Sequence, residues 1–346
     1  MRKLIMLLGL YGFACTFFTH NIYAQTYEKT SESGKVRFQC ELEVPEEINE
    51  KNTAPKILLE SVNFGDSAKA YANFVEGQDI VNQYNDPAND LYPEENAYVF
   101  ADGTHVNIGR GIGISTDNFT YYGQIGATNP ENMERYVSAA NSSVDEQAAV
   151  QKVKEALEQA GYMTETLDFK TYPLSAEVSE EIENQLVQEG LLENDKRKNE
   201  WTKEDDACVV YARQVVSGIP VYPELSVMAQ QLAYDTPDSC PVVAIYSTRG
   251  IESLRVYGLY NFKETGESVT LKSFDEIAAT VEMKYENLLD EAVYTVNRAK
   301  FYERVYINEA QQYVAEPIWY LELTSDTSNQ YVMLVNAETG KEIYLM

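Results

Sequence analysis

The chain has 346 residues and a formal net charge of −28, because 55 Asp and Glu residues stand against only 27 Lys and Arg residues. A surface this acidic repels nucleic acid and anionic membranes, since both require a basic footprint on the protein. With 44% hydrophobic residues and 26 Tyr, the chain can bury a substantial core, which excludes an intrinsically disordered protein.

Residues 1–24 have the pattern of a signal peptide. After a basic start, the apolar run from Leu4 to Phe18 is too short to span a bilayer, and Ala24 supplies the small residue of a cleavage site. An uncleaved membrane anchor and a lipoprotein lipidated at Cys15 are the alternatives. We therefore expect a secreted or extracytoplasmic protein, with a membrane-anchored lipoprotein as the alternative, and a polar linker over residues 25–35.

Three cysteines remain after cleavage: Cys40, Cys208 and Cys240. In an oxidising compartment a Cys208–Cys240 disulfide is one expectation, worth about 3–4 kcal/mol by the chain-entropy model. Buried thiols are the equal alternative, because the odd count does not fit a complete disulfide framework.

Histidine supplies the main argument against catalysis. His105 is the one histidine left after cleavage, and zinc sites and nucleophile–base triads need more than this. We expect His105 to be a surface strand residue, and we expect no catalytic residue, no cofactor and no metal site. A hydrolase that uses only carboxylates stays open, although no pair of acids stands out.

Residues 36–142 read as a β-rich N-terminal domain. Apolar and polar residues alternate strictly over 36–44, which predicts a strand with one buried face. A β-meander is predicted over strands 104–108, 112–116 and 119–125.

Between two of these strands, Gly109-Arg110-Gly111-Ile112-Gly113 invites comparison with a nucleotide-binding loop. The dinucleotide fingerprint needs a GxGxxG spacing that opens a helix. Here the spacing is GxGxG and strands follow, so a turn or bulge is predicted.

Residues 143–260 are predicted to form a first helix-plus-sheet module. Ser143 and Glu146 have the spacing of a capping box, and the apolar stripe behind them predicts an amphipathic helix. Residues 175–206 form a charged insertion with a second amphipathic helix.

Residues 261–346 are predicted to repeat the pattern as a second module. Ser273 and Glu276 again have capping-box spacing, and antiparallel strands follow the helix. The fold class is therefore α+β, with antiparallel sheets that each pack against one amphipathic helix, a stable two-layer arrangement.

Five motifs in order carry a resemblance to a known group of proteins. They are Val209-Val210-Tyr211-Ala212-Arg213 with Ser217-Gly218-Ile219-Pro220-Val221, then Ser247-Thr248-Arg249-Gly250-Ile251, Val269 to Ile277, Glu316-Pro317-Ile318-Trp319, and Val335 to Gly340. Over roughly residues 145–346 the chain resembles uncharacterised secreted lipoproteins of clostridial bacteria. These in turn resemble the YycH/YycI regulators of a cell-wall sensor kinase and the PepSY module.

The resemblance implies two tandem PepSY-like modules outside the cytoplasmic membrane, without enzymatic activity. PepSY-type modules are associated with restraining proteases, and YycH/YycI proteins with restraining a kinase through protein contacts. This chain lacks the transmembrane helix of YycH/YycI and has a poor lipobox, and the family supplies no catalytic residue.

The leading functional hypothesis is a non-catalytic binding or regulatory protein with a protein or peptide partner in the cell envelope. Trp319, Tyr320 and Tyr331 are the candidate partner-contact aromatics, suited to strand addition at a sheet edge, with burial in the core as the alternative. The alternative function is a cell-wall or carbohydrate-binding protein, in which Tyr121 and Tyr122 stack on sugars.

Overall fold

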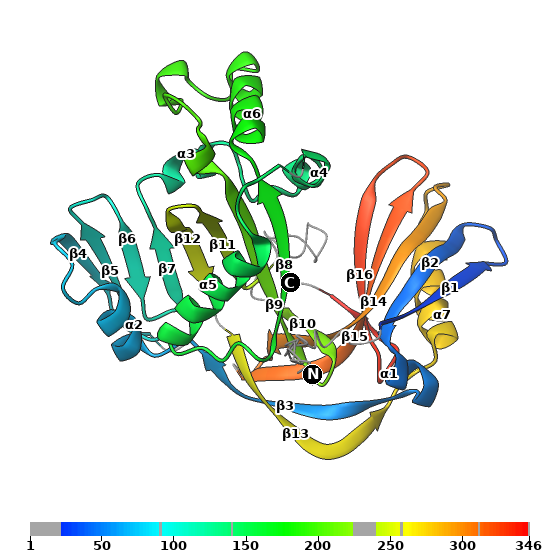
Figure 1. The fold of residues 1–346 in the computed structure, drawn as a ribbon. Coiled ribbons are helices and arrows are strands. Elements are labelled where there is room, and N and C mark those ends of the chain that lie inside the picture. Colours follow the sequence, from blue (N-terminus) through cyan, green and yellow to red (C-terminus); the bar gives the residue numbers. More distant parts are fainter. Residues whose placement is uncertain are drawn as a thin grey trace, which may run out of the picture.

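The structure is a computed structural model that describes residues 22–89, 92–139, 141–223, 240–256, 259–310 and 312–344. Over these residues the chain is an α+β protein in which strands predominate, which confirms the predicted fold class (Figure 1). Most strands join one long sheet. We divide it into a first half-sheet, which has β4 as its outer edge strand, and a second half-sheet, which has β17 as its outer edge strand. Cys15 and the apolar run of the predicted signal peptide lie outside the described residues.

The first half-sheet is antiparallel throughout and runs in the order β8-β9-β11-β12-β7-β6-β5-β4. Its strands are β4 (Ile80–Asp86), β5 (Glu95–Phe100), β6 (His105–Ile108), β7 (Ile112–Ser115), β8 (Leu167–Leu174), β9 (Ala207–Val216), β11 (Val242–Ser247) and β12 (Gly250–Val256). His105 is exposed on β6, as predicted.

Helix α5 (Glu146–Gln159) covers one face of this half-sheet, together with α2 (Ser67–Phe74). The buried stripe of α5 includes Val153 and Leu157, as predicted. The predicted cap is wrong, because Asp145 and not Ser143 accepts the backbone N–H of Ala148. The Ser143 N–H instead donates to the Asp206 carboxylate at 2.8 Å, a tertiary contact that the local pattern does not contain.

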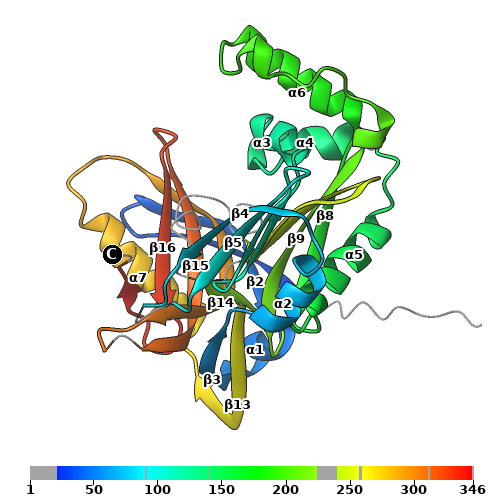
Figure 2. The ribbon, with the colours of Figure 1, turned by 90° about the vertical axis from the view of Figure 1, so that its left-hand side faces the viewer.

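A small helical layer stands at one end of the first half-sheet (Figure 2). It holds α3 (Phe119–Gln124), α4 (Pro130–Ala139), α6 (Ala176–Gln188) and the short 3₁₀ helices Asn194–Lys196 and Lys203–Asp205. The predicted strand over 119–125 is therefore wrong. Its Tyr122 is completely buried in this layer and donates to the Asp205 carbonyl at 2.8 Å, so tertiary packing selects the helix.

The second half-sheet is mixed, because β14 pairs in parallel with both β2 and β10 and antiparallel with β15. Its strands are β1 (Ile22–Thr30), β2 (Val36–Pro45), β10 (Ile219–Pro223), β14 (Tyr294–Ile307), β15 (Tyr313–Ser325), β16 (Gln330–Asn336) and β17 (Glu342–Ile343). Strand β1 reaches back to Ile22 and takes up residues 25–30, so most of the predicted linker 25–35 belongs to the sheet; the predicted cleavage after residue 24 stays a prediction.

Helix α7 (Phe274–Glu286) packs on the second half-sheet over the largest buried cluster. The predicted capping box is confirmed, with the Ser273 side chain and Glu276 bonding to each other's backbone N–H groups. Strand β2 buries every second residue from Val36 to Val44, as the alternation predicts. Helix α1 (Glu46–Lys51) follows it.

Strands β3 (Thr53–Asn63) and β13 (Leu259–Thr270) form a separate two-stranded antiparallel ribbon that runs beneath both half-sheets (Figure 1). Ala54 at one end belongs to the core under α7, and Leu259 at the other belongs to the core under α5. The ribbon therefore ties the two cores together.

The strand pairings divide the chain differently from the predicted domains. Residues 36–142 form no separate unit, because β2 belongs to the second half-sheet and β4 to β7 belong to the first. The hairpin from β9 to β10 carries the chain from one half-sheet to the other. Each predicted module, 143–260 and 261–346, is thus completed by N-terminal strands.

The GxGxG segment is the predicted turn, between β6 and β7. Gly109 has φ +130° and Gly111 has φ +126°, values that side chains rarely allow. A Cβ on Gly109 would lie 1.9 Å from the Glu94 carbonyl oxygen. The two glycines therefore allow close backbone approach at this turn.

We predict that Gly109→Ala lowers the free energy of unfolding by about 3 kcal/mol or more, since the new Cβ meets a fixed carbonyl as well as an unfavourable φ. Gly266→Ala is the matched control, because Gly266 also has a positive φ (+76°) but nothing lies within 4 Å of its Cβ position. The control should cost only about 1 kcal/mol. Urea denaturation of both variants measures the difference; equal costs would show that the contact at Gly109 relaxes freely.

Candidate functional site

The predicted partner-contact aromatics divide between the interior and the surface. Trp319 is 5% exposed, with its ring 4.8 Å from that of Phe274 and 5.5 Å from that of Phe301. Tyr320 is 1% exposed on the opposite face of β15. The prediction that these two contact a partner is therefore wrong, and their core alternative holds. Tyr331 is 36% exposed on β16, so its partner role stays a prediction.

The predicted Cys208–Cys240 disulfide is also wrong for this structure. Cys208 on β9 lies opposite Tyr246, whereas Cys240 precedes Val242, which lies opposite Ala212. The two cysteines therefore stand about six residues apart along a strand pair, or about 20 Å. A disulfide spans at most about 7 Å between Cα atoms. Both side chains are buried, as is Cys40.

The aromatics considered for sugar stacking are occupied within the helical layer. Tyr122 is completely buried and Trp201 is 8% exposed, and their rings pack edge to face at 5.6 Å. The Lys198 ammonium lies over the rings of both Tyr121 and Trp201, at 4.9 and 5.2 Å from their centroids. Tyr122 and Trp201 are therefore buried, and the Lys198 ammonium covers one face of Tyr121.

Two buried carboxylates, Asp205 and Glu252, anchor an ion network where the helical layer meets the first half-sheet. Asp205 accepts from the Lys198 ammonium at 2.8 Å and from the Arg249 guanidinium at 2.6 Å. Arg249 also pairs with Glu252 at 3.0 Å. Burial alone would raise the pKa of Asp205, but hydrogen bonds from Lys198, the Thr202 backbone and Arg249 lower it below its ordinary value.

The Glu252 carboxylate also has a hydrogen-bond partner for each of its two oxygens. Its oxygens accept from Thr116, Asn118 and Ser247 as well as from Arg249. A shallow recess of about 310 Å³ opens beside this network. Both carboxylates have hydrogen-bond partners on each oxygen, so the network fastens the charged insertion 175–206 to the β11–β12 turn.

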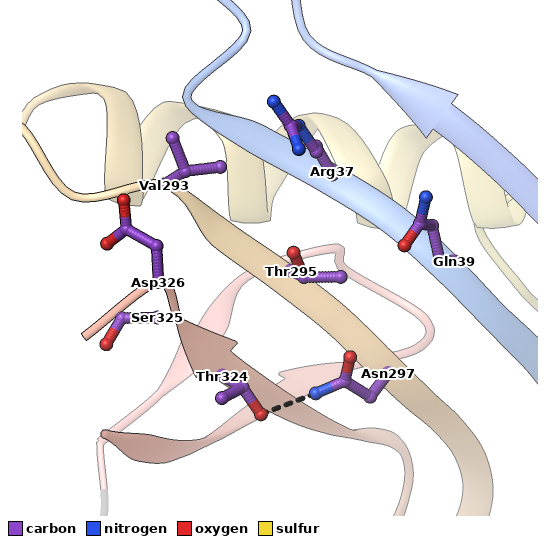
Figure 3. A pocket seen from close by; sticks show the side chains of 8 residues that line it. All are labelled: Arg37, Gln39, Val293, Thr295, Asn297, Thr324, Ser325 and Asp326. Atoms are coloured by element: carbon purple, nitrogen blue, oxygen red, sulfur yellow. Dashed lines mark hydrogen bonds between the residues drawn. The ribbon is translucent and has the colours of Figure 1, made fainter. Parts of the chain in front are cut away.

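A larger polar groove, with a volume of about 520 Å³, lies on the second half-sheet on the face away from α7 (Figure 3). Its lining residues come from the ends of β2, β14 and β15 and are Arg37, Gln39, Val293, Thr295, Asn297, Thr324, Ser325 and Asp326. The strand register explains the gathering, since Thr295 lies between Arg37 on one side and Thr324 on the other. We call this the polar groove.

Arg37 gives the polar groove its charge. It is exposed, and over the described part of the chain its guanidinium makes no ion pair and no hydrogen bond. Asn297 is also exposed and donates to the Thr324 hydroxyl at 2.6 Å. The groove therefore offers a guanidinium, amides and hydroxyls, which are groups that hydrogen-bond carboxylates and peptide backbone. Asp326 is its only carboxylate, so the lining holds no pair of acids.

Glu303 on β14 is the one described carboxyl whose pKa is strongly raised. It is 2% exposed, and its Oε2 has no hydrogen-bond partner among the described residues. Burial, followed by the negative charge of Glu316, raises the pKa of Glu303 to about 8. Glu303 lines neither the polar groove nor the recess. It lies between Val221 of β10 and Pro317 of β15 in the strand ladder.

The comparisons show a shared fold but no family. The chain is similar to an uncharacterised protein from Eubacterium rectale, with 13% identity, a TM-score of 0.55 and coverage of 93% of this chain and 94% of that one. It is weakly similar to the YpeB C-terminal domain of Bacillus megaterium, with 11% identity, a TM-score of 0.31 and coverage of 86% and 95%. No family model and no curated protein matches the chain.

The first similarity shows a common fold along nearly the whole chain, and the second is too weak to support any conclusion. The resemblance to clostridial lipoproteins with PepSY-like modules therefore stays a prediction. Within the described ranges, no helix is long and apolar enough to cross a membrane. Over the same ranges no cluster of three or more metal-binding side chains occurs.

We predict that Asp205→Asn lowers the free energy of unfolding by about 3 kcal/mol at pH 7, because it removes the carboxylate from the largely buried Lys198 ammonium, while Arg249 keeps Glu252. The ionised form is favoured in the folded state, so this contribution is present above the ordinary pKa of 3.8 and is lost as the pH falls further. Urea denaturation at pH 7 and at pH 3 measures both effects.

The matched control is Asp168→Asn, since Asp168 pairs with Arg213 at 2.9 Å but is 54% exposed. An exposed pair contributes only about 0–1 kcal/mol. If the two substitutions cost the same, the Asp205 network does not fasten the insertion.

We predict that Glu303→Gln changes the pH dependence of stability. The folded-state pKa is raised, so wild-type stability falls as the pH rises from about 4.5, the ordinary value, to about 8, and then levels off. The glutamine variant lacks this decline, and its advantage over the wild type should grow across that window. Unfolding curves at several pH values test this; a constant difference would contradict a buried neutral carboxyl.

Proposed function

We propose that this chain is a non-catalytic binding or regulatory protein that acts outside the cytoplasm through contacts with a protein or peptide. The observation that carries the proposal is Arg37, an exposed arginine without an ion pair or hydrogen bond among the described residues, inside an open polar groove. The guanidinium fork is suited to bidentate recognition of a carboxylate.

The rest of the groove fits an extended peptide. Gln39, Thr295 and Asn297 supply amide and hydroxyl groups beside Arg37 along the strand direction. These groups can hydrogen-bond the N–H and C=O groups of a chain laid along the strands, while Arg37 takes an acidic side chain or a C-terminal carboxylate. No lining residue is aromatic, which favours a peptide over a sugar, since sugars are usually held by stacking on aromatic rings.

The extracytoplasmic part of the proposal rests on the sequence. The basic start, the apolar run from Leu4 to Phe18 and Ala24 have the order of an export signal. Lipidation at Cys15 is the alternative anchor. The buried carboxylates of the Asp205–Glu252 network support a non-catalytic role, because their hydrogen-bonding capacity is taken up within the fold.

We predict that peptides selected from a random phage-displayed library on the full chain carry Asp, Glu or a free C-terminus, and that Arg37→Glu weakens their binding at least about tenfold. Arg37→Lys should give a partial loss, because an ammonium lacks the bidentate fork. Fluorescence anisotropy of the selected peptides measures the affinities.

Met283→Ala is the matched control, since Met283 is 63% exposed on α7, behind the sheet from the groove. It should bind as the wild type does. Failure to enrich any peptide, or equal binding by Arg37→Glu, would contradict the proposal. Binding of peptide-free wall glycans that depends on Arg37 would favour the carbohydrate alternative instead.

A further inference from the structure

Strand β4 is an edge strand that lies open over its whole length. It ends the first half-sheet, and it pairs only with β5 over the described residues (Figures 1 and 2). All seven of its residues, Ile80–Asp86, are exposed. One row of backbone N–H and C=O groups along β4 therefore faces outward. Apart from the Gln83 N–H, which donates to the Asn82 side chain at 2.9 Å, this row is a template for a further strand.

Other edges of the described sheets carry features that discourage strand addition. Strand β8 contains Lys170 and Pro173, β1 contains Lys29, and β17 has only two residues. Lysine, proline and short length are the usual means of protecting an edge. Strand β4 has the sequence IVNQYND, with no lysine, arginine or proline. Its own sequence therefore carries none of these protective features.

The side chains of β4 suit a contact surface. Val81 is 62% exposed and Tyr84 is 59% exposed, so apolar area is available beside the open backbone. Asn82 donates to the Tyr84 hydroxyl at 2.5 Å, which holds the ring in place. After an irregularity at Val81, Asn82–Asp86 pair regularly with Glu95–Val99, so the outward backbone has the spacing of a regular ladder.

Charge determines the kind of strand that fits. Glu76 and Asp79 are exposed just before β4, and the Asp79 carbonyl accepts the Ala101 N–H at 2.9 Å, which places Asp102 at the same end. Asp86 at the other end pairs with Arg110 at 2.5 Å. The end of β4 near Asp79 is therefore acidic, which favours a partner segment that carries basic residues.

A second copy of the chain fits poorly. A two-fold axis at Gln83 would pair β4 with itself and bring Asp86 of one copy beside Asp79 of the other. Two chains that each carry a net charge of −28 would meet along this edge. In this pairing Asp86 lies opposite Ile80 and next to Asp79, and like charges that meet on neighbouring strands disfavour self-association.

We propose that β4 docks an extended segment of another protein that carries basic residues beside its strand, by adding that segment to the first half-sheet. The site is distinct from the polar groove, since it lies at the other end of the sheet and recognises cations rather than carboxylates. Backbone pairing along Asn82–Asp86 provides affinity, and the acidic end provides selectivity.

The test uses the full chain and three synthetic peptides of alternating valine and threonine. One has lysine at both ends, one has glutamate there, and one is the lysine peptide with a central proline. Hydrogen–deuterium exchange of residues 80–86 and fluorescence anisotropy are measured for each. The lysine peptide should slow exchange in β4, the glutamate peptide should bind at least about tenfold more weakly, and the proline peptide should give no protection.

Two variants add the same charge at exposed apolar positions. Tyr84→Lys on β4 should weaken binding of the lysine peptide at least about tenfold, whereas Leu289→Lys, at a residue fully exposed beyond α7, should not. Unchanged exchange in β4 at saturating lysine peptide, or equal loss in both variants, would overturn the proposal. A dimer in sedimentation velocity that Tyr84→Lys dissociates would assign the edge to a second copy. Arg37→Glu should leave this binding unchanged, which separates failure here from failure of the groove.

Discussion

The pairing of β14 is the constraint on which the rest of the structure depends. Its backbone pairs with β2, β10 and β15, which come from three separate parts of the chain. Buried peptide groups must be paired, so each of these strands is fixed in register by the others. Through β10 the same strand also connects the second half-sheet to the first. A change that moved β14 would displace both cores.

An irregularity in β14 creates the polar groove. At Asn297 the ladder with both neighbouring strands shifts, so Val296 and Ala299 both enter the core although an odd spacing separates them. A strand with strict alternation would turn one of them outward. The bulge leaves Asn297 exposed, with its amide donating to the Thr324 hydroxyl, and a polar groove thus follows from the way in which the strand completes its core.

Local signals in the sequence predict the elements that depend on neighbouring residues. The alternation of Val36 to Val44 and the Ser273–Glu276 capping box both reappear in the structure, because each acts within a few residues. Where distant contacts decide, prediction fails. Residues 119–125 become a helix because Tyr122 is drawn into a tertiary cluster, and β2 joins β14 from the other end of the chain. Neither outcome can be predicted from the residues that are adjacent in the sequence.

The candidate site could not be predicted for the same reason. Arg37, Thr295 and Thr324 belong to no motif, and only the register of three strands brings them together. The aromatics that looked suited to contact, Trp319 and Tyr320, are large apolar surfaces that gain most from burial in a sheet of this size. The two candidate binding surfaces are instead the polar groove and the backbone edge of β4. These surfaces would bind the backbone and the charged groups of a partner and not a single side chain in a pocket. The position of the charges must therefore determine which partner binds.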